Sequence, residues 1–131
     1  MIFVDSNIPM YLVGADHPHK TDAQRLLERA VVAGRALVTD VEVFQEILHR
    51  YVAIDRRDAI APAWELLKSI TDQIAPVDID DATAARDLVL AGVAISARDA
   101  IHVATMRKLG CTDILTFDRG FDAVPGVTRV V

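Results

Sequence analysis

The stretch Met1-Ile-Phe-Val-Asp5-Ser-Asn7 places a carboxylate directly after a short apolar run. The run predicts a buried strand at residues 2–4, so Asp5 is expected at the carboxyl end of that strand. Three other acids, far apart in the sequence, also stand close to the predicted start or end of an element: Glu46, Asp99 and Asp118. Because an α/β fold gathers strand ends and helix starts at one edge of its sheet, we expect the four carboxylates to lie together there.

Apolar runs and amphipathic stretches alternate along the whole sequence. Strands are predicted at residues 2–4, 36–38, 74–77, 114–117 and 127–131, and helices at about 19–32, 39–52, 55–70, 80–91 and 96–109. Pro62 is expected to kink the third helix, and Gly110 to end the fifth. This alternation favours a three-layer α/β/α fold around a mostly parallel sheet of four to five strands. The length of 131 residues predicts a single domain over residues 1–131.

The composition excludes several classes of protein. No apolar run approaches the length that crosses a bilayer, and the N-terminal residues lack a basic secretory leader. We therefore expect a soluble cytoplasmic protein with no membrane partner. Cys111 is the only cysteine, which rules out an internal disulfide and argues against a thiol enzyme. The net charge of −5 does not exclude a nucleic-acid partner, because setting aside the four site acids leaves only −1.

Asp5 and Asp118 are the two candidate metal ligands that follow predicted strands. Each also fits a simpler role as the first residue of a turn. Against that role, a buried strand places Asp5 at the bottom of a crevice, where a second strand-end carboxylate would approach it. Such carboxylates repel one another unless a cation lies among them, and Mg²⁺ or Mn²⁺ prefers oxygen ligands. Ser6 and Asn7 would either bind metal-bound water or phosphate oxygens, or satisfy backbone groups.

Glu46 and Asp99 are the two candidates on predicted helices. Thr39 and Glu42 match a capping box, which gives Glu42 a structural role and leaves Glu46, on a largely apolar helix, as the metal ligand. An ion pair with a basic residue one turn later is the alternative for Glu46. Asp99 matches a second capping box with Ser96, but a carboxylate in the first helical turn can also face a cation.

The remaining polar residues give weaker signals. The four histidines lack the close spacing of zinc ligands and single out no site, and Trp64 is expected in the core or at an interface. Arg98 and Arg119 each neighbour one of the site acids and are candidates for contacts with RNA phosphates, although ordinary solvated charges are the favoured explanation for both. Asp122 is a weaker fifth acid, for which an exposed loop position is favoured.

Four segments, taken in order, resemble the PIN-domain ribonucleases: Asp5-Ser-Asn7, Glu46-Ile-Leu-His-Arg-Tyr51, Ser96-Ala-Arg-Asp99-Ala-Ile-His102 and Thr116-Phe-Asp118. More narrowly, the chain is similar over essentially its whole length to the VapC toxins of toxin–antitoxin pairs. The resemblance implies accessory polar roles for Ser6 and Thr116, a homodimer, and a small antitoxin whose tail blocks the acidic pocket. It also implies that Mg²⁺ or Mn²⁺ is bound by an acidic quartet, which consists of Asp5, Glu46, Asp99 and Asp118.

The expected function is metal-dependent endonucleolytic hydrolysis of RNA. The bound ion or ions would lower the pKa of a water molecule that attacks phosphorus in line with the leaving oxygen. The carboxylates would position metal and water rather than act as nucleophiles. Single-stranded or looped RNA is the expected substrate, because its phosphates and bases are accessible. A toxin and a housekeeping RNA-processing nuclease are both compatible with this chemistry.

Two other classes remain open. A phosphatase of the haloacid dehalogenase type also begins with a strand-end Asp, but it usually has another Asp two residues later, where this chain has Asn7. A receiver-like or purely interacting α/β domain would lack metal-dependent cleavage. A receiver needs a phosphoacceptor Asp at a mid-chain strand end, whereas Asp55 falls at a predicted helix start.

Overall fold

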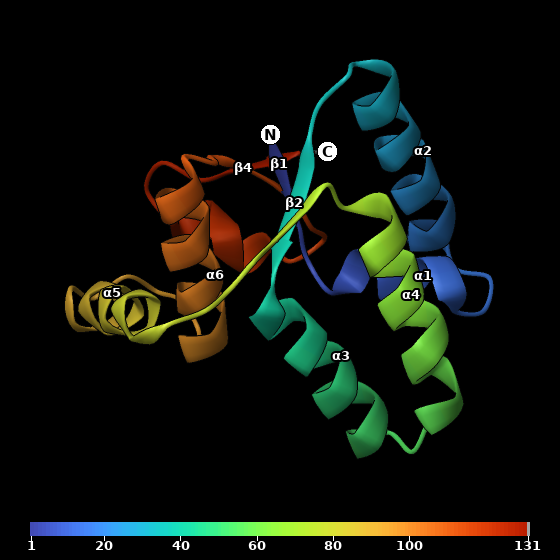
Figure 1. The fold of residues 1–131 in the computed structure, drawn as a ribbon, viewed down its shortest axis with the longest axis horizontal. Helices are drawn as coiled ribbons and strands as arrows, with labels where there is room; N and C mark the ends of the chain where they lie inside the picture. Colours follow the sequence, from blue (N-terminus) through green and yellow to red (C-terminus); the bar gives the residue numbers. More distant parts are fainter. Residues whose placement is uncertain (131) are drawn as a thin grey trace.

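The computed structural model describes residues 1–130, in which strands and α-helices alternate (Figure 1). The strands are β1 (Ile2–Val4), β2 (Leu37–Asp40), β3 (Gln73–Ala75), β4 (Asp113–Leu115) and β5 (Thr128–Val130). The helices are α1 (Asn7–Val13), α2 (Pro18–Val32), α3 (Val41–Ala53), α4 (Ile60–Ile70), α5 (Ile79–Leu90) and α6 (Ala97–Leu109), with short 3₁₀ turns η1 (Arg57–Ala59) and η2 (Arg119–Ala123). Val131, the last residue of the fifth predicted strand, lies outside the described residues.

The five strands form one sheet in the order β3-β2-β1-β4-β5, and every neighbouring pair is parallel. Strand β1 is therefore central, with Phe3 opposite Val38 of β2 and Ile114 of β4. All strands point the same way, so their carboxyl ends share one edge of the sheet. The predicted parallel sheet is confirmed, and it places Asp5 at the middle of that edge.

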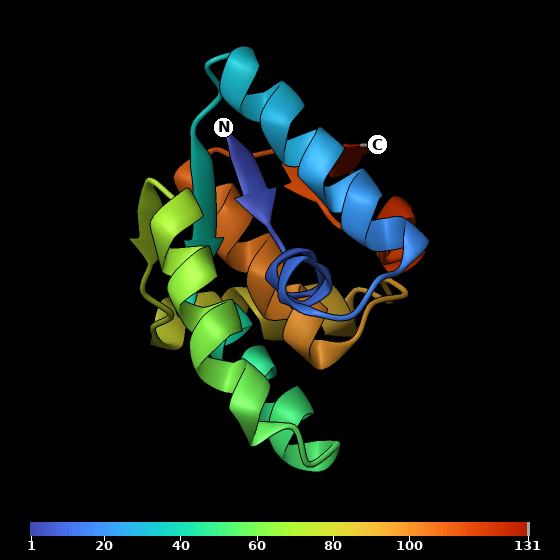
Figure 2. The same ribbon diagram turned by 90° about the vertical axis from the view of Figure 1, so that its right-hand side faces the viewer.

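Helices cover both faces of the sheet. Figure 1 shows α5 and α6 on one side of the strands and α1, α2 and α4 on the other, and Figure 2 looks onto the latter layer. Helix α3 continues directly from β2 and extends beyond the carboxyl edge of the sheet. The three-layer α/β/α fold is thus confirmed. No helix among residues 1–130 combines the length and apolarity needed to cross a membrane.

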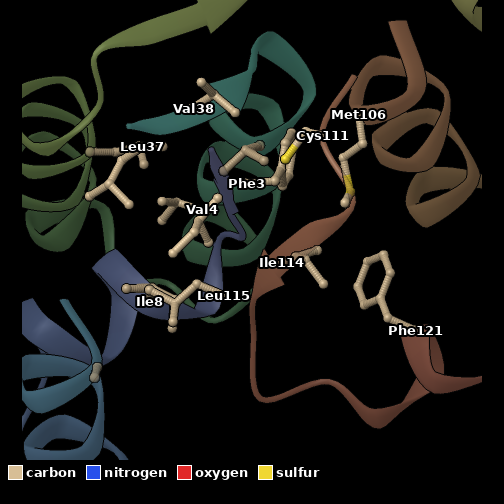
Figure 3. Close-up of a cluster of buried hydrophobic side chains, with 14 of the residues drawn as sticks. Phe3, Val4, Ile8, Leu37, Val38, Met106, Cys111, Ile114, Leu115 and Phe121 are labelled. Atoms are coloured by element: carbon tan, nitrogen blue, oxygen red, sulfur yellow. The ribbon is translucent and has the colours of Figure 1, made fainter. Parts of the chain in front are cut away.

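The core lies on both sides of β1 and β4. Successive residues of a strand point to opposite faces, and both faces of this sheet are covered, so both sets of side chains are apolar. Phe3 and Val4 are fully buried, as are their partners on β4. Figure 3 shows Met106 and Phe121 on one side of these strands and Ile8 on the other. The buried run that positions Asp5 is therefore held from two directions.

Two predicted details of the helices are wrong. The predicted capping box of Thr39 and Glu42 does not form, because β2 extends further than expected and Thr39 lies within it, donating its hydroxyl to the carbonyl of Val4 (2.9 Å). Asp40 caps α3 instead, accepting a hydrogen bond from the Val43 amide (2.9 Å). Pro62 does not kink a helix, because α4 begins only at Ile60 and proline is tolerated in a first turn.

Two further boundaries differ from the prediction. Helix α1 was not predicted, because no element was assigned between the first strand and the helix at about 19–32. Helix α5 runs over Ile79–Leu90 rather than about 80–91, and Asp78 caps it through a full capping box with Asp81. The end of α6 at Gly110 is as predicted, with Gly110 in the left-handed conformation (φ 71°).

Candidate functional site

Asp5 is the most firmly held acid at the carboxyl edge. Its side chain is buried and accepts hydrogen bonds from the Ser6 amide (2.7 Å) and the Thr116 hydroxyl (2.6 Å). Thr116 reaches it because β4 lies next to β1 and the residue after each strand emerges at the same place. The side-chain amide of Asn7 donates to the Thr116 hydroxyl oxygen (2.9 Å) and to the Asp5 carboxylate (3.4 Å). Predicted residues from both strand ends thus converge on one carboxylate.

The buried position changes the acidity of Asp5. Burial raises the pKa of this carboxyl from 3.8 to about 6, and the positive charge of His102 and the hydrogen bond from Thr116 limit the rise. At neutral pH the group is therefore ionised. It is then a desolvated anion, which favours binding of a cation.

Glu46 lies on α3, two turns after Asp40, and only 13% of its side chain is exposed. Arg98 of α6 faces it, with Nε 3.8 Å from Glu46 Oε1 and 3.4 Å from Glu42 Oε1. Glu42, which was predicted to be a cap, is instead one member of this ion-pair group. Arg98 therefore neutralises part of the charge that α3 brings to the site.

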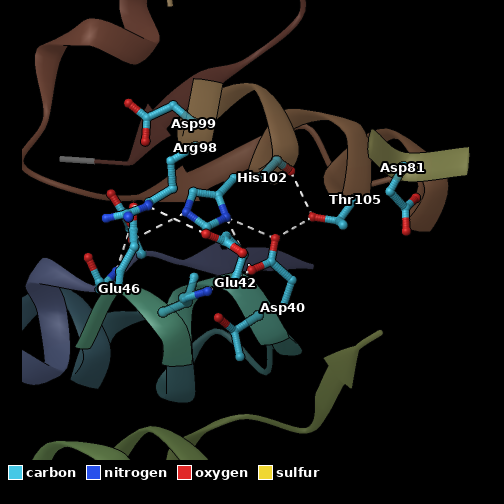
Figure 4. Close-up of polar contacts among 12 residues, drawn as sticks. Asp40, Glu42, Glu46, Asp81, Arg98, Asp99, His102 and Thr105 are labelled. Carbon is cyan, nitrogen blue, oxygen red and sulfur yellow. Dashed lines mark hydrogen bonds and ion pairs between the residues drawn. The ribbon is translucent and has the colours of Figure 1, made fainter. Parts of the chain in front are cut away.

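His102 is a second positive group within the site, and it is completely buried (Figure 4). Nδ1 lies 2.9 Å from Oδ2 of Asp40, which also accepts the Thr105 hydroxyl (2.6 Å). On the other side, Nε2 lies 3.3 Å from Glu46 Oε2, although the two atoms are not aligned as a hydrogen bond. Burial alone would lower the pKa of His102, but the contacts with Asp40 and Glu46 outweigh it and raise the pKa well above 6.5. His102 is thus an imidazolium between two carboxylates.

The other two predicted acids line the same open cavity, of about 800 Å³, as Asp5 and Glu46. Asp99 is partly buried in the first turn of α6, where its amide donates to the Ser96 hydroxyl (3.1 Å). Burial raises the pKa of the Asp99 carboxyl, and the positive charge of His102 limits the rise. Asp118 is exposed and accepts the Gly120 amide (2.8 Å). All four acids therefore line one cavity, and their role as metal ligands stays a prediction.

The tightest group of metal-ligating side chains in the described residues consists of Asp5, Glu46 and His102, whose ligand atoms all lie within 4.8 Å of one another. Asp99 and Asp118 are outside that group. Glu46 Oε2 is buried and makes no aligned hydrogen bond among residues 1–130, although the His102 imidazolium lies 3.3 Å from it. A metal ion in the cavity would be a further cation beside this carboxylate. The oxygen donors of this site suit Mg²⁺ or Mn²⁺. A ring nitrogen of His102 belongs to this group, and the contact with Asp40 favours the protonated form, in which His102 is a neighbouring charge.

Residues 2–127 match the PIN domain. This span covers nearly all of the described chain, including every acid discussed above.

The chain belongs to the PIN-domain family.

Curated relatives place this PIN domain among the VapC ribonucleases. It is 56% identical over 130 residues to ribonuclease VapC13 of Mycobacterium tuberculosis and, equally, to VapC ribonuclease Mb1869c of Mycobacterium bovis, with 99% of each chain covered. Among solved structures, it matches VapC20 of M. tuberculosis, described as a sarcin-ricin loop cleaving toxin, with a TM-score of 0.77 and 24% identity over 94% of both chains. That structural match supports the fold alone.

The remaining predicted residues occupy different places in this PIN domain. Ser6 and Asn7 line the cavity, and the Ser6 side chain makes no capping hydrogen bond to the described residues. Arg98 also lines the cavity, whereas Arg119 is exposed and is not among the lining residues. Asp122 pairs with Arg129 through two bonds of 2.8 and 3.0 Å, outside the cavity.

Sequence reasoning missed Asp40 and His102. The histidines were set aside for lack of zinc spacing, yet His102 lies three residues after Asp99 and so shares a face of α6 with it. Asp40 is the last residue of β2, much as Asp5 directly follows β1, and Thr39 was preferred as the cap. Two sequence signals would have found Asp40 and His102. These are the histidine one turn after Asp99 on the same helix and the acid at the end of a second apolar run.

The raised pKa of Asp5 predicts a specific dependence of stability on pH in EDTA. Between pH 3.8 and about 6, folded Asp5 keeps a proton that the unfolded chain has lost. The free energy of unfolding should therefore fall as pH rises through this window, by up to about 3 kcal/mol from this group. Urea unfolding from pH 4 to 7 would measure it, and the difference between wild type and Asp5→Asn isolates Asp5. Identical pH slopes for the two proteins would contradict the assignment.

Proposed function

We propose that this PIN domain is a metal-dependent endoribonuclease and the toxin of a VapBC-like toxin–antitoxin pair, acting in the cytoplasm on RNA. The observation that carries the proposal is the gathering of four acids around one cavity, of which Asp5 is buried and Glu46 has only 13% of its side chain exposed. The 56% identity to VapC ribonucleases over 99% of the chain supports it. We also propose that residues 1–131 form a single domain.

One or two Mg²⁺ or Mn²⁺ ions would be held by the acidic quartet, which consists of Asp5, Glu46, Asp99 and Asp118. When bound, such an ion supplies positive charge that lowers the pKa of water and offsets charge developing on phosphate. Hydrolysis adds water to phosphorus and breaks the bond to the leaving ribose oxygen. The protein's own share is placement, because Thr116 and the Ser6 amide fix the Asp5 carboxylate.

The two cations already in the site would adjust its charge. His102 lies next to one carboxylate oxygen of Glu46, and Arg98 lies next to the other and to Glu42. They limit the mutual repulsion of the acids, so the quartet can form before metal binds. His49 and Arg50 of α3 also line the cavity and are additional candidates for contacts with RNA phosphates, beside Arg98 and Arg119.

A cognate antitoxin and a homodimer belong to the same proposal. Similar folds include VapBC2 of Rickettsia felis, solved bound to a DNA fragment from its promoter, with a TM-score of 0.74 and 14% identity over 99% of this chain and 98% of that one. An apolar groove of about 400 Å³ lies apart from the acids. A second copy of the chain would cover this groove. Its lining includes Val41, Phe44, Leu48, Trp64 and Ile74.

The proposal predicts that RNA cleavage depends on divalent metal. Cleavage of a labelled single-stranded RNA in Mg²⁺ or Mn²⁺ should disappear in EDTA and return when excess Mg²⁺ is added, because the carboxylates need an ion to act on phosphate. Single-stranded DNA of the same sequence serves as the substrate control. Calorimetry with Mn²⁺ gives a reading independent of activity. Undiminished cleavage in EDTA would refute the metal-dependent mechanism.

A further inference from the structure

Four aromatic rings form a cluster at the rim of the acidic cavity. Tyr11 at the end of α1 has its ring centroid 5.0 Å from that of His17 and 5.5 Å from that of Phe117. His19 stacks on Phe117 at 4.1 Å with an angle of 13° between the planes. We call these four residues the ring wall.

The ring wall is physically continuous with the proposed catalytic site. Tyr11 and His17 line the cavity that contains the four acids, whereas His19 and Phe117 are not among its lining residues. Phe117 stands between Thr116 and Asp118 in the chain, and its amide lies within reach of the Asn7 side chain (3.4 Å). The front pair of rings therefore faces the cavity, and the rear pair supports it.

Packing of the protein alone does not account for the front pair. His17 has one structural role, since Nδ1 accepts the His19 amide (3.0 Å) and caps α2. Ser, Asp or Asn perform that role without an aromatic ring. The His17 side chain is otherwise exposed, and Tyr11 is only partly buried. Aromatic surface left in contact with water beside an anionic cavity is well suited to binding a flat, neutral group.

We propose that Tyr11 and His17 stack on an unpaired base of the RNA next to the phosphate that is cleaved. This inference rests on the proposed ribonuclease function and adds a determinant of its substrate. Nucleobases stack on aromatic side chains whatever their sequence, whereas the bases of a duplex are already stacked on one another. The ring wall therefore selects single-stranded or looped RNA. It compensates for a cavity whose acids repel the RNA backbone.

Three substitutions test the ring wall with matched controls. Tyr11→Leu removes the ring but keeps an apolar side chain, and Tyr11→Phe keeps the ring. His17→Asn removes the imidazole but keeps a residue that caps α2. The probe is a fluorescein-labelled, unstructured RNA oligonucleotide, used alone and annealed to its complement, in Mg²⁺.

For the single strand, Tyr11→Leu is expected to raise KM about tenfold and His17→Asn about threefold, with kcat changed less than about twofold. Tyr11→Phe should stay within about twofold of wild type. The preference for the single strand over the duplex should shrink in Tyr11→Leu, because the duplex gains nothing from stacking. A purely structural role would instead change the melting temperature and kcat, with no selective effect on KM.

The outcomes separate the two proposals. If wild type cleaves the RNA and both Tyr11→Leu and His17→Asn keep its KM, the ring wall has no role in binding and this inference is wrong. If wild type neither binds nor cleaves the RNA, the ribonuclease proposal is wrong, and the inference with it. Should Tyr11→Leu melt at a much lower temperature, His17→Asn decides, because its helix cap is retained.

Discussion

Asp5→Asn is expected to reduce RNA cleavage by at least about a hundredfold, because it removes the central ligand of the proposed metal site. Asparagine has nearly the same shape but no negative charge. The Asp5 carboxylate is the one that both neighbouring strand ends position, through the Ser6 amide and the Thr116 hydroxyl. Within the part of the chain that the structure describes, no other acid of the site is held by two strand ends, so no neighbour can replace it.

The fold should survive this substitution. At pH 7 the desolvated Asp5 anion opposes folding by about 3 kcal/mol, given a pKa of about 6 against 3.8. Asparagine removes that penalty but brings one mismatch. Its side-chain NH₂ group would face the Thr116 hydroxyl oxygen, which already accepts hydrogen bonds from the Asn7 side chain and the Asp118 backbone amide (2.9 and 3.0 Å). A disrupted hydrogen bond costs about 1–3 kcal/mol. The two effects nearly cancel, so the melting temperature in EDTA should lie close to that of wild type.

Asp16→Asn is the matched control, because Asp16 lines the same cavity but is exposed at its rim. It removes the same charge, and cleavage should change by less than about threefold. Cleavage rates, circular dichroism and calorimetry with Mn²⁺ make up the measurement. Wild-type cleavage by Asp5→Asn would show that this carboxylate is not a metal ligand in the reaction. If Asp5→Asn fails to fold, Glu46→Gln tests the same site.

The strand-end acids were predictable because the pattern that marks a buried strand also marks its end. Three apolar residues before Asp5 imply a central parallel strand, and parallel strands share one carboxyl edge. From this it followed that Asp5 and Asp118 lie at the same edge. Strand β4 ends earlier than predicted, at Leu115, so Thr116 rather than Asp118 contacts Asp5, and Asp118 lines the same cavity from an exposed position. The position of Asp99 followed in a similar way, because its capping pattern fixed the start of α6.

The cations of the site were not predictable in the same way. His102 reaches Asp40 across 62 residues and between two layers of the fold, so no local pattern joins them. The choice between Thr39 and Asp40 as the cap depended on how far β2 extends, and neighbouring strands decide that. Local capping rules can rank residues of similar propensity only weakly, and the pairing of strands overrides them.

His102 also changes the argument that led from the acids to a metal. Repulsion among four carboxylates was expected to require a bound ion, but the chain contributes two positive groups of its own, His102 and Arg98. The metal-free site is therefore already partly neutralised. What still favours a metal ion is the buried Asp5 carboxyl, because a cation in the cavity would offset the desolvation that raises its pKa.

His102→Ala is expected to lower the free energy of unfolding by about 3–5 kcal/mol, because it leaves Asp40 as a buried anion without its counter-charge. It also removes a ring that packs against Phe3, with centroids 5.5 Å apart. His102 has a pKa raised above 6.5, so its contribution is fully present below pH 6.5 and is lost only as pH rises through the raised value. The gap between wild type and His102→Ala in urea unfolding should therefore narrow at high pH.

The double variant Asp40→Asn, His102→Ala should recover about 1–3 kcal/mol relative to His102→Ala, because the introduced asparagine carries no uncompensated charge and still caps α3. His49→Ala is the control, since His49 lines the same cavity but is exposed, and it should change stability by less than about 0.5 kcal/mol. Strictly additive effects of the two substitutions would mean that Asp40 and His102 do not stabilise one another. In that case the Asp40 carboxylate would be stabilised only by the Thr105 hydroxyl and the Val43 amide. The His102 imidazolium would then gain no stability from its contact with Asp40.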